Sequence, residues 1–195
     1  LSVAVALCAV RAWATDYVWN SGADGDWEEP SNWSPSTGYP SAADDTATIP
    51  NPVKSEGVGS AFTVTVNTPF SIAALSVAGT AGHDGSVTLL FKTGYSTNAV
   101  SGDITLGNHA TVTHFGPNTA RDYAVVLKAG GNFTIAAGAS VNVDQKGYTF
   151  VSNKNGYGPG AGRDNGRYGG ETEVFVAVGI IHGSVRRPVD YGASV

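Results

Sequence analysis

The feature that most constrains the fold of this chain is a series of short apolar pairs, each pair split by one residue, from Phe62 onward. Glycine, asparagine or proline stands between most of them, and these residues favour turns. Alternation over so few residues predicts short half-buried β-strands, and no segment after residue 20 repeats apolar residues with a helical period over three turns. The sequence therefore predicts an all-β fold. The pairs are Val64/Val66, Leu75/Val77, Val87/Leu89, Ile104/Leu106, Val125/Leu127, Phe133/Ile135 and Val141/Val143.

Two all-β architectures fit short strands at this spacing, a β-sandwich and a parallel β-helix. Weak internal similarity distinguishes them. The segment "LGNHATV" runs from Leu106 to Val112, and the similar segment "LKAGGNFTI" runs from Leu127 to Ile135. A recurring step of about 21–23 residues favours a right-handed parallel β-helix with one coil per repeat, and the β-sandwich remains the alternative.

The composition of the chain argues against a nucleic-acid partner. Charged residues make up 14% of the chain, the net charge is −5, and no basic run is longer than Arg186-Arg187. A nucleic-acid surface needs clustered basic side chains that release counterions from phosphates. We therefore expect no nucleic-acid partner.

The first residues have the pattern of a targeting segment. "LSVAVALCAV" is almost wholly apolar, and Arg11 and then "AWA", ending at Ala14, follow it. An apolar stretch of this length before a small-x-small site predicts a secretory signal peptide over residues 1–14. A buried first strand or helix is the alternative, and Leu7 fits lipidation of Cys8 poorly. The predicted location is secreted or at the cell surface, with the membrane involved only through export or a C-terminal region.

Residues 15–61 differ in composition from the rest and are predicted to form an N-terminal cap and the first coil. The segment is rich in tryptophan, proline and turn residues. An open end of a β-helix exposes core and unpaired strand edges, so it needs a cover. The aromatic side chains of Trp19, Trp27, Trp33 and Tyr39 are predicted to seal that end; stacking on sugar rings is the alternative. Residues 62–195 are then the β-helix coils.

A glycine-rich segment, "GYGPGAGRDNGRYGG" at residues 156–170, lies within a predicted loop over residues 152–172. It lacks the Gly-Lys-Ser/Thr end of a P-loop, and Pro159 removes a donor from the dinucleotide fingerprint that it partly matches. We predict no cofactor. A packed excursion between coils is the favoured interpretation. The alternative is a groove for an anionic or sugar ligand, lined by Tyr157, Arg163, Arg167 and Tyr168.

Acidic side chains give only weak candidates for catalysis. Asp122 and Asp144 are separated by about one predicted coil, so they could stack one above the other, with Lys128 as a basic partner. Asp103 is a further candidate. Paired carboxylates are the groups that cleave glycosidic bonds. These residues would carry the chemistry only if the protein were an enzyme.

No metal site is predicted from the acidic residues and histidines. The acidic pairs Asp24/Asp26 and Asp44/Asp45 lack the full run of ligands of a calcium loop, so turn and capping roles are favoured. A zinc site needs closely grouped ligands, whereas the histidines are scattered along the chain. They are His83, His109, His114 and His182.

Two longer segments resemble a known group of proteins. Residues 19–49 contain Trp19, "GDW", "NW", "YP" and "DD" at spacings similar to the opening of bacterial autotransporter-like surface proteins. "QKGY" at 145–148, "GPGAG" at 158–162, "YGG" at 168–170 and "PVDYGA" at 188–193 resemble a glycine-rich motif of large secreted β-helix proteins. His182 and "DYGAS" depart from that motif. The resemblance implies an exported β-helix that continues beyond this fragment.

These observations support two hypotheses for the function and favour the first of them. The first hypothesis is a non-enzymatic exported surface or extracellular protein with an adhesive or structural display role. The second is an extracellular β-helix that binds or cleaves polysaccharide. In both, the expected partner is an extracellular polysaccharide or a cell-surface glycan. No Gly-x-Ser-x-Gly elbow is present to anchor a hydrolase triad, so the balance is against an enzyme.

Overall fold

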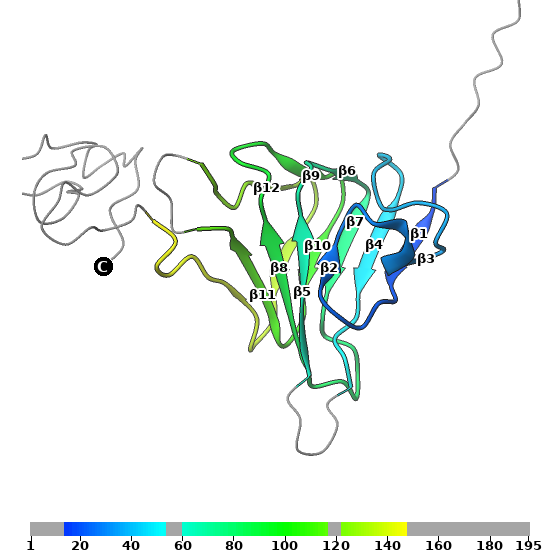
Figure 1. Cartoon of the computed structure of the whole chain (residues 1–195), viewed down its shortest axis with the longest axis horizontal. Coiled ribbons are helices and arrows are strands. Elements are labelled where there is room, and N and C mark those ends of the chain that lie inside the picture. The colour runs from blue at the N-terminus through cyan, green and yellow to red at the C-terminus, as the bar shows by residue number, and fades with distance from the viewer. Residues whose placement is uncertain (1–13, 54–59, 117–121, 148–195) are drawn as a thin grey trace, which may run out of the picture.

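The computed structural model describes residues 14–53, 60–116 and 122–147, which form a parallel β-solenoid (Figure 1). The predicted signal peptide up to residue 13 and the glycine-rich loop, with its four candidate ligand-binding residues, lie outside these ranges. Three sheets form the sides of the coil, and from β4 onward the chain visits them in the order A, B, C before it starts the next coil. In the described ranges all strand pairings are parallel except that of β1 with β3. This pattern confirms the predicted β-helix and excludes the β-sandwich.

The strands are short, as the apolar pairs predict. Sheet A contains β1 (Asp16–Trp19), β3 (Trp33–Ser34), β4 (Thr46–Ile49), β7 (Ala74–Val77), β10 (Ile104–Leu106) and β13 (Phe133–Ile135). Sheet B contains β2 (Gly25–Asp26), β5 (Ala61–Val66), β8 (Ser86–Phe91), β11 (Ala110–His114) and β14 (Ser140–Val141). Sheet C contains β6 (Ser71–Ile72), β9 (Asn98–Val100) and β12 (Leu127–Ala129). One 3-10 turn, η1 (Pro30–Asn32), precedes β3.

The coil is longer than the step that the repeats predicted. In sheet A, Leu75 pairs with Ile104 and Ile104 pairs with Phe133. The hydrogen bond that joins Asp103 to Asn132 spans the same sequence interval of 29. The steps in sheet B are unequal: they are shorter where Val64 pairs with Leu89 and Leu89 with Val112. From β11 to β14 the interval is again 29, as for Thr111 and Ser140.

The internal similarity that suggested the shorter step joins two different sides of the coil. Leu106 ends β10 of sheet A, whereas Leu127 begins β12 of sheet C. The two segments are similar because each one crosses a corner of the coil through a turn that contains glycine. The similarity therefore indicated the solenoid correctly and its coil length wrongly.

The core is a set of apolar columns that run along the solenoid axis. Each inward residue packs above the residue at the same position of the previous coil, and the columns continue through β4, β7 and β10 and through β5, β8 and β11. At about 25 cal/mol per Å² of apolar surface removed from water, these columns are the main stabilising term. The most deeply buried members are Ile49, Val64, Val66, Ile72, Val77, Val87, Leu89, Phe91, Ile104, Leu106 and Val112.

The N-terminal end of the solenoid carries a cluster of buried aromatic rings. Trp27 and Trp33 have exposed fractions of 0% and 1%, and their ring centroids are 4.9 Å apart. The ring of Trp27 stacks on Phe70 of the next coil at 4.7 Å, while β3 closes sheet A by pairing antiparallel with β1. Burial makes these tryptophans unavailable for stacking on a sugar and confirms the sealing role. In Figure 1 this end lies at the right, and the coils advance to the left.

Adjacent coils touch through their backbones at the turns after β7 and β10. Gly79 has φ of +79°, which favours glycine. A Cβ atom on Gly107 would collide with the backbone of Gly79 in the coil before it. Glycine at these turns therefore allows the coils to stack at the spacing of β-strands, about 4.8 Å.

Candidate functional site

The acidic and basic residues that the sequence singled out do not form one site. Asp122 precedes β12 of sheet C, whereas Asp144 follows β14 of sheet B. The interval between them is shorter than the step of this coil, in which β11 pairs with β14 and β9 with β12. The predicted stacking of the two carboxylates is therefore wrong. Lys128 is exposed on β12 and pairs with Ala99.

Several other acidic residues have structural roles. Asp103 Oδ1 accepts the backbone N–H of Asn132 at 2.7 Å, and this bond ties one coil to the next. Asp45 is buried, and its carboxylate accepts three backbone N–H groups at 2.9–3.2 Å, from Thr15, Ser41 and Ala42. In the described ranges no three His, Cys, Asp or Glu side chains are arranged to hold a metal ion.

One cluster at a corner of the solenoid combines an exposed aromatic ring with a cation. Phe115 directly follows β11, and Lys92 directly follows β8 of the previous coil. The N–H of Phe115 donates to the carbonyl of Phe91 at 2.8 Å, which continues the pairing of β8 with β11 to the corner. This register places the Lys92 ammonium 4.9 Å from the centroid of the Phe115 ring. We call Lys92, Phe115 and Tyr123 the aromatic corner.

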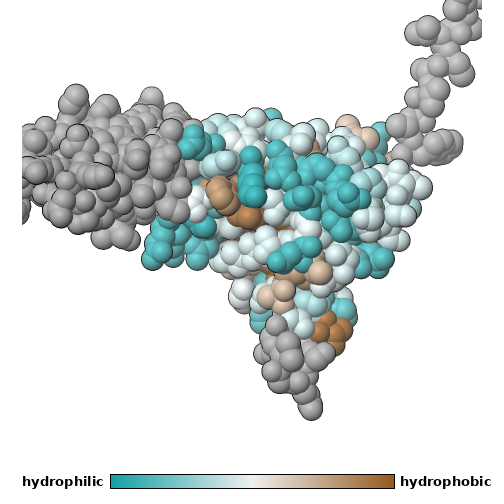
Figure 2. Space-filling model, in the orientation of Figure 1, coloured by the Kyte–Doolittle hydropathy of each residue, from teal (hydrophilic) through white to brown (hydrophobic). Residues whose placement is uncertain are grey.

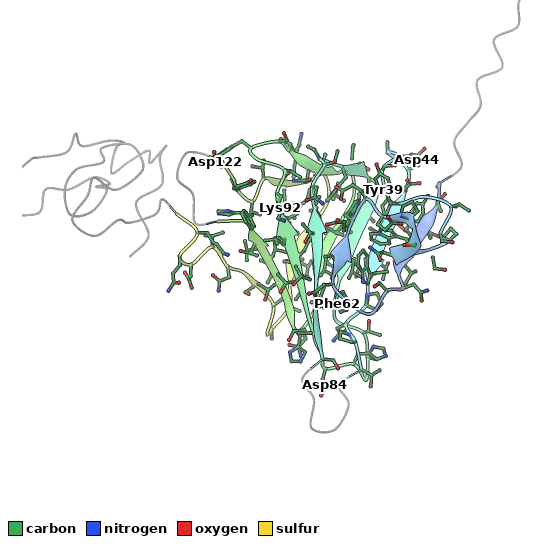
Figure 3. The ribbon with its side chains drawn as sticks, in the orientation of Figure 1. Tyr39, Asp44, Phe62, Asp84, Lys92 and Asp122 are labelled. Atoms are coloured by element: carbon green, nitrogen blue, oxygen red, sulfur yellow. The ribbon has the colours of Figure 1, made fainter. Side chains whose placement is uncertain are left out.

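Tyr123 completes the aromatic corner from the segment that leads into β12. Its ring meets the Phe115 ring edge to face, with centroids 5.3 Å apart and planes at 78°. The segment is attached to the previous coil, because the N–H of Ala124 donates to the carbonyl of Gly94 at 3.2 Å. Phe115 nevertheless remains 46% exposed, and Lys92 is exposed. Figure 3 shows Lys92 and Asp122 on this side of the molecule.

A buried polar network lies next to the aromatic corner. The Asn98 amide nitrogen donates to the Thr93 hydroxyl at 3.0 Å and to the Val126 carbonyl at 3.2 Å, and both Thr93 and Asn98 are buried. His114 Nδ1 lies 2.7 Å from the carbonyl of Phe115, so that nitrogen carries the proton and donates. These bonds attach Thr93, next to Lys92, and the carbonyl of Phe115 to neighbouring groups of the solenoid.

The surface at this corner is of mixed character. Figure 2 shows apolar atoms next to hydrophilic atoms near the carboxyl ends of β8 and β11. Sequence reasoning missed the corner because Phe115 and Lys92 are far apart in the chain and belong to no motif. The register of β8 with β11 is the only signal that brings them together.

No protein-family model, curated protein or solved structure matches the chain. In the part of the chain that the structure describes, no helix is long and apolar enough to cross a bilayer. The fold defines the class of protein, a parallel β-solenoid.

Proposed function

We propose that this chain belongs to an exported β-solenoid of the cell surface or the extracellular space, with an adhesive or structural display role. The observation that carries the proposal is that the two faces of each strand differ in character. Inward positions form continuous apolar columns, whereas most outward positions are polar or small and contribute little to the core. Such a scaffold carries varied side chains on a rigid rod. In sheet A the outward column is Thr48, Ser76, Thr105 and Thr134.

Export is supported by residues 1–14, whose apolar run and small-x-small end resemble a signal peptide. The experiment is expression of the full chain behind an added Met-Lys-Lys leader in a bacterial host, followed by fractionation and intact mass. We expect protein outside the cytoplasm whose first residue is Thr15. Ala14→Phe should leave residues 1–14 attached, whereas Thr15→Ser should be processed normally. Uncleaved parent protein confined to the cytoplasm would contradict the proposal.

The adhesive role requires a surface that recognises something outside the cell. The aromatic corner is the described surface that favours such recognition, because it combines a large exposed aromatic ring with a hydrogen-bond donor on a rigid support. Retention of the purified chain on immobilised polysaccharides or on intact cells, compared with a bovine serum albumin control, tests this role. Display without retention on any of these surfaces would limit the role to a structural one.

A further inference from the structure

We infer that the carboxylates of Asp24 and Glu28 keep the N-terminal edge of sheet B closed to a second copy of this chain. The inference goes beyond the proposed function and does not rest on it. It starts from the unequal lengths of the two strands of sheet B at this end. β2 has two residues and β5 has six, and β2 pairs only with Val64 and Thr65. The main chain of β2 therefore covers only part of the edge of β5, and an uncovered strand edge is a template for pairing with another chain.

Two carboxylates accept the edge N–H groups on either side of this short pairing. Asp24 Oδ1 accepts the N–H of Thr63 at 2.6 Å, just before the paired residues. Glu28 Oε1 accepts the N–H of Asn67 at 2.9 Å and that of Thr68 at 2.6 Å, just after them. We call Asp24 and Glu28 the edge carboxylates. They occupy donors that a further strand would otherwise use, and hydrogen bonds to charged groups are stronger than those between neutral groups.

The edge carboxylates also hold β2 in place. A strand with two paired residues opens easily by local unfolding, so its stability depends on additional contacts. The side-chain amide of Asn67 adds to these contacts, because its Nδ2 donates to Asp26 Oδ1 at 3.0 Å and to Glu28 Oε2 at 3.3 Å. Sheet A ends differently, since β3 pairs with β1 through its main chain. In sheet B, unlike sheet A, closure of the edge therefore depends on side chains that substitutions can remove.

A second copy of the chain is the occupant that an opened edge would accept. An extended strand supplies main-chain carbonyls to the free N–H groups of β5, which is recognition by β-augmentation. Every copy carries the same edge, so two copies can pair symmetrically without a further partner. Charge opposes this approach in the parent protein, because residues 14–53 contain seven acidic residues and no lysine or arginine. The edge carboxylates thus act both as hydrogen-bond acceptors and as like charges.

The test measures self-association of the full chain by sedimentation equilibrium over a range of protein concentrations. Asp24→Ala/Glu28→Ala should self-associate about tenfold more strongly than the parent, because edge donors lose their acceptors and two like charges are removed. Amide hydrogen exchange locates the contact. In dilute solution of this variant, the N–H groups of Thr63, Asn67 and Thr68 should exchange faster than in the parent, and they should regain protection as the concentration rises.

Two further variants make the result specific to the edge. Asp24→Asn/Glu28→Gln keeps an acceptor oxygen at each position and removes both charges, so its association should lie between those of the parent and the alanine variant. Asp16→Ala/Asp44→Ala removes two exposed charges, one on β1 and one just before β4. This control should associate as the parent does, within about twofold, because salt screens exposed charges that are not at the contact.

Circular dichroism shows which variants fold. Parent-like association of a folded Asp24→Ala/Glu28→Ala variant would overturn the inference, and so would association of that variant without renewed protection of the three amides. Association of the Asp16→Ala/Asp44→Ala control to the same degree would also overturn it, because any charge of this end would then suffice. If the alanine variant does not fold, parent-like association of Asp24→Asn/Glu28→Gln overturns the inference. Export and retention are measured separately, so the proposed function stands or fails independently of this result.

Discussion

Leu106 and Ile135 occupy the same inward position of consecutive coils, yet Leu106 is fully buried and Ile135 is 48% exposed. The difference follows from their neighbours. β10 lies between β7 and β13, whereas β13 is the last strand of sheet A in the described part of the chain. The stabilisation that an inward apolar side chain contributes therefore depends on whether a neighbouring coil covers it on each side, and not on the residue type alone.

This relationship predicts unequal costs for the same kind of truncation. Leu106→Ala should lower the free energy of unfolding by about 2–5 kcal/mol, because it leaves a cavity in a closed column. Ile135→Ala should lower it by less than about 1 kcal/mol, because half of the side chain already faces solvent. Urea denaturation of the full chain, followed by circular dichroism, measures both. Equal losses would show that Ile135 is covered in solution.

The apolar pairs predicted the inward columns well, and the coil length poorly. Val64/Val66 and Leu75/Val77 are buried as predicted, because alternation reports directly which side of a strand faces the core. The predicted step failed because a coil contains three strands joined by turns of different length, so similar corners recur within one coil. Strands of sheet C, such as β6, are too short to carry an alternation signal.

The site was harder to predict than the fold for the same reason. Lys92 and Phe115 come together only when β8 is paired with β11 in the correct register. A shift of one residue would turn Phe115 to the other side of the strand. The candidate pair Asp122 and Asp144 depended on the wrong step, so no reasoning from spacing alone could have tested it.

The buried tryptophans provide a test of hydrogen bonding in the cap. Trp33 Nε1 donates to the Trp27 carbonyl at 2.7 Å, whereas Trp19 Nε1 is buried and has no partner among the described residues. Trp33→Phe leaves a buried carbonyl without its donor, whereas Trp19→Phe removes an unsatisfied donor. Both lose similar volume, so Trp33→Phe should be more destabilising by about 1–3 kcal/mol. Thermal or urea unfolding of the two variants measures the difference, and a larger loss for Trp19→Phe would contradict the account.

Asp45 and Asp44 are neighbours with different environments. Asp45 is 5% exposed and accepts backbone N–H groups from Thr15, Ser41 and Ala42, while Asp44 is exposed. Asp45→Ala leaves several amides without an acceptor and should cost about 2–3 kcal/mol of stability. Asp44→Ala should change stability by less than about 0.5 kcal/mol. Chemical denaturation should show the larger loss of stability for Asp45→Ala in both calcium-free and calcium-containing buffer. If calcium raised the free energy of unfolding of the parent but of neither variant, the pair would instead have a metal-binding role.

Glu29 predicts a specific pH dependence in the cap. The Ser31 backbone N–H, at 3.1 Å, and then the Ser31 hydroxyl, at 2.9 Å, donate to its carboxylate and lower the pKa of Glu29 below its ordinary value of 4.5. Because the folded pKa is the lower one, the contribution to stability is present above the ordinary pKa and is lost as the pH falls through the folded pKa.

Ser31→Ala keeps the backbone donor and removes the hydroxyl, so it should raise the pKa of Glu29 only part of the way towards the ordinary value. An NMR titration of the Glu29 carboxyl carbon measures the change, with Ser34→Ala, an exposed serine in β3, as the control. An unchanged pKa in Ser31→Ala would mean that the hydroxyl bond does not persist in solution.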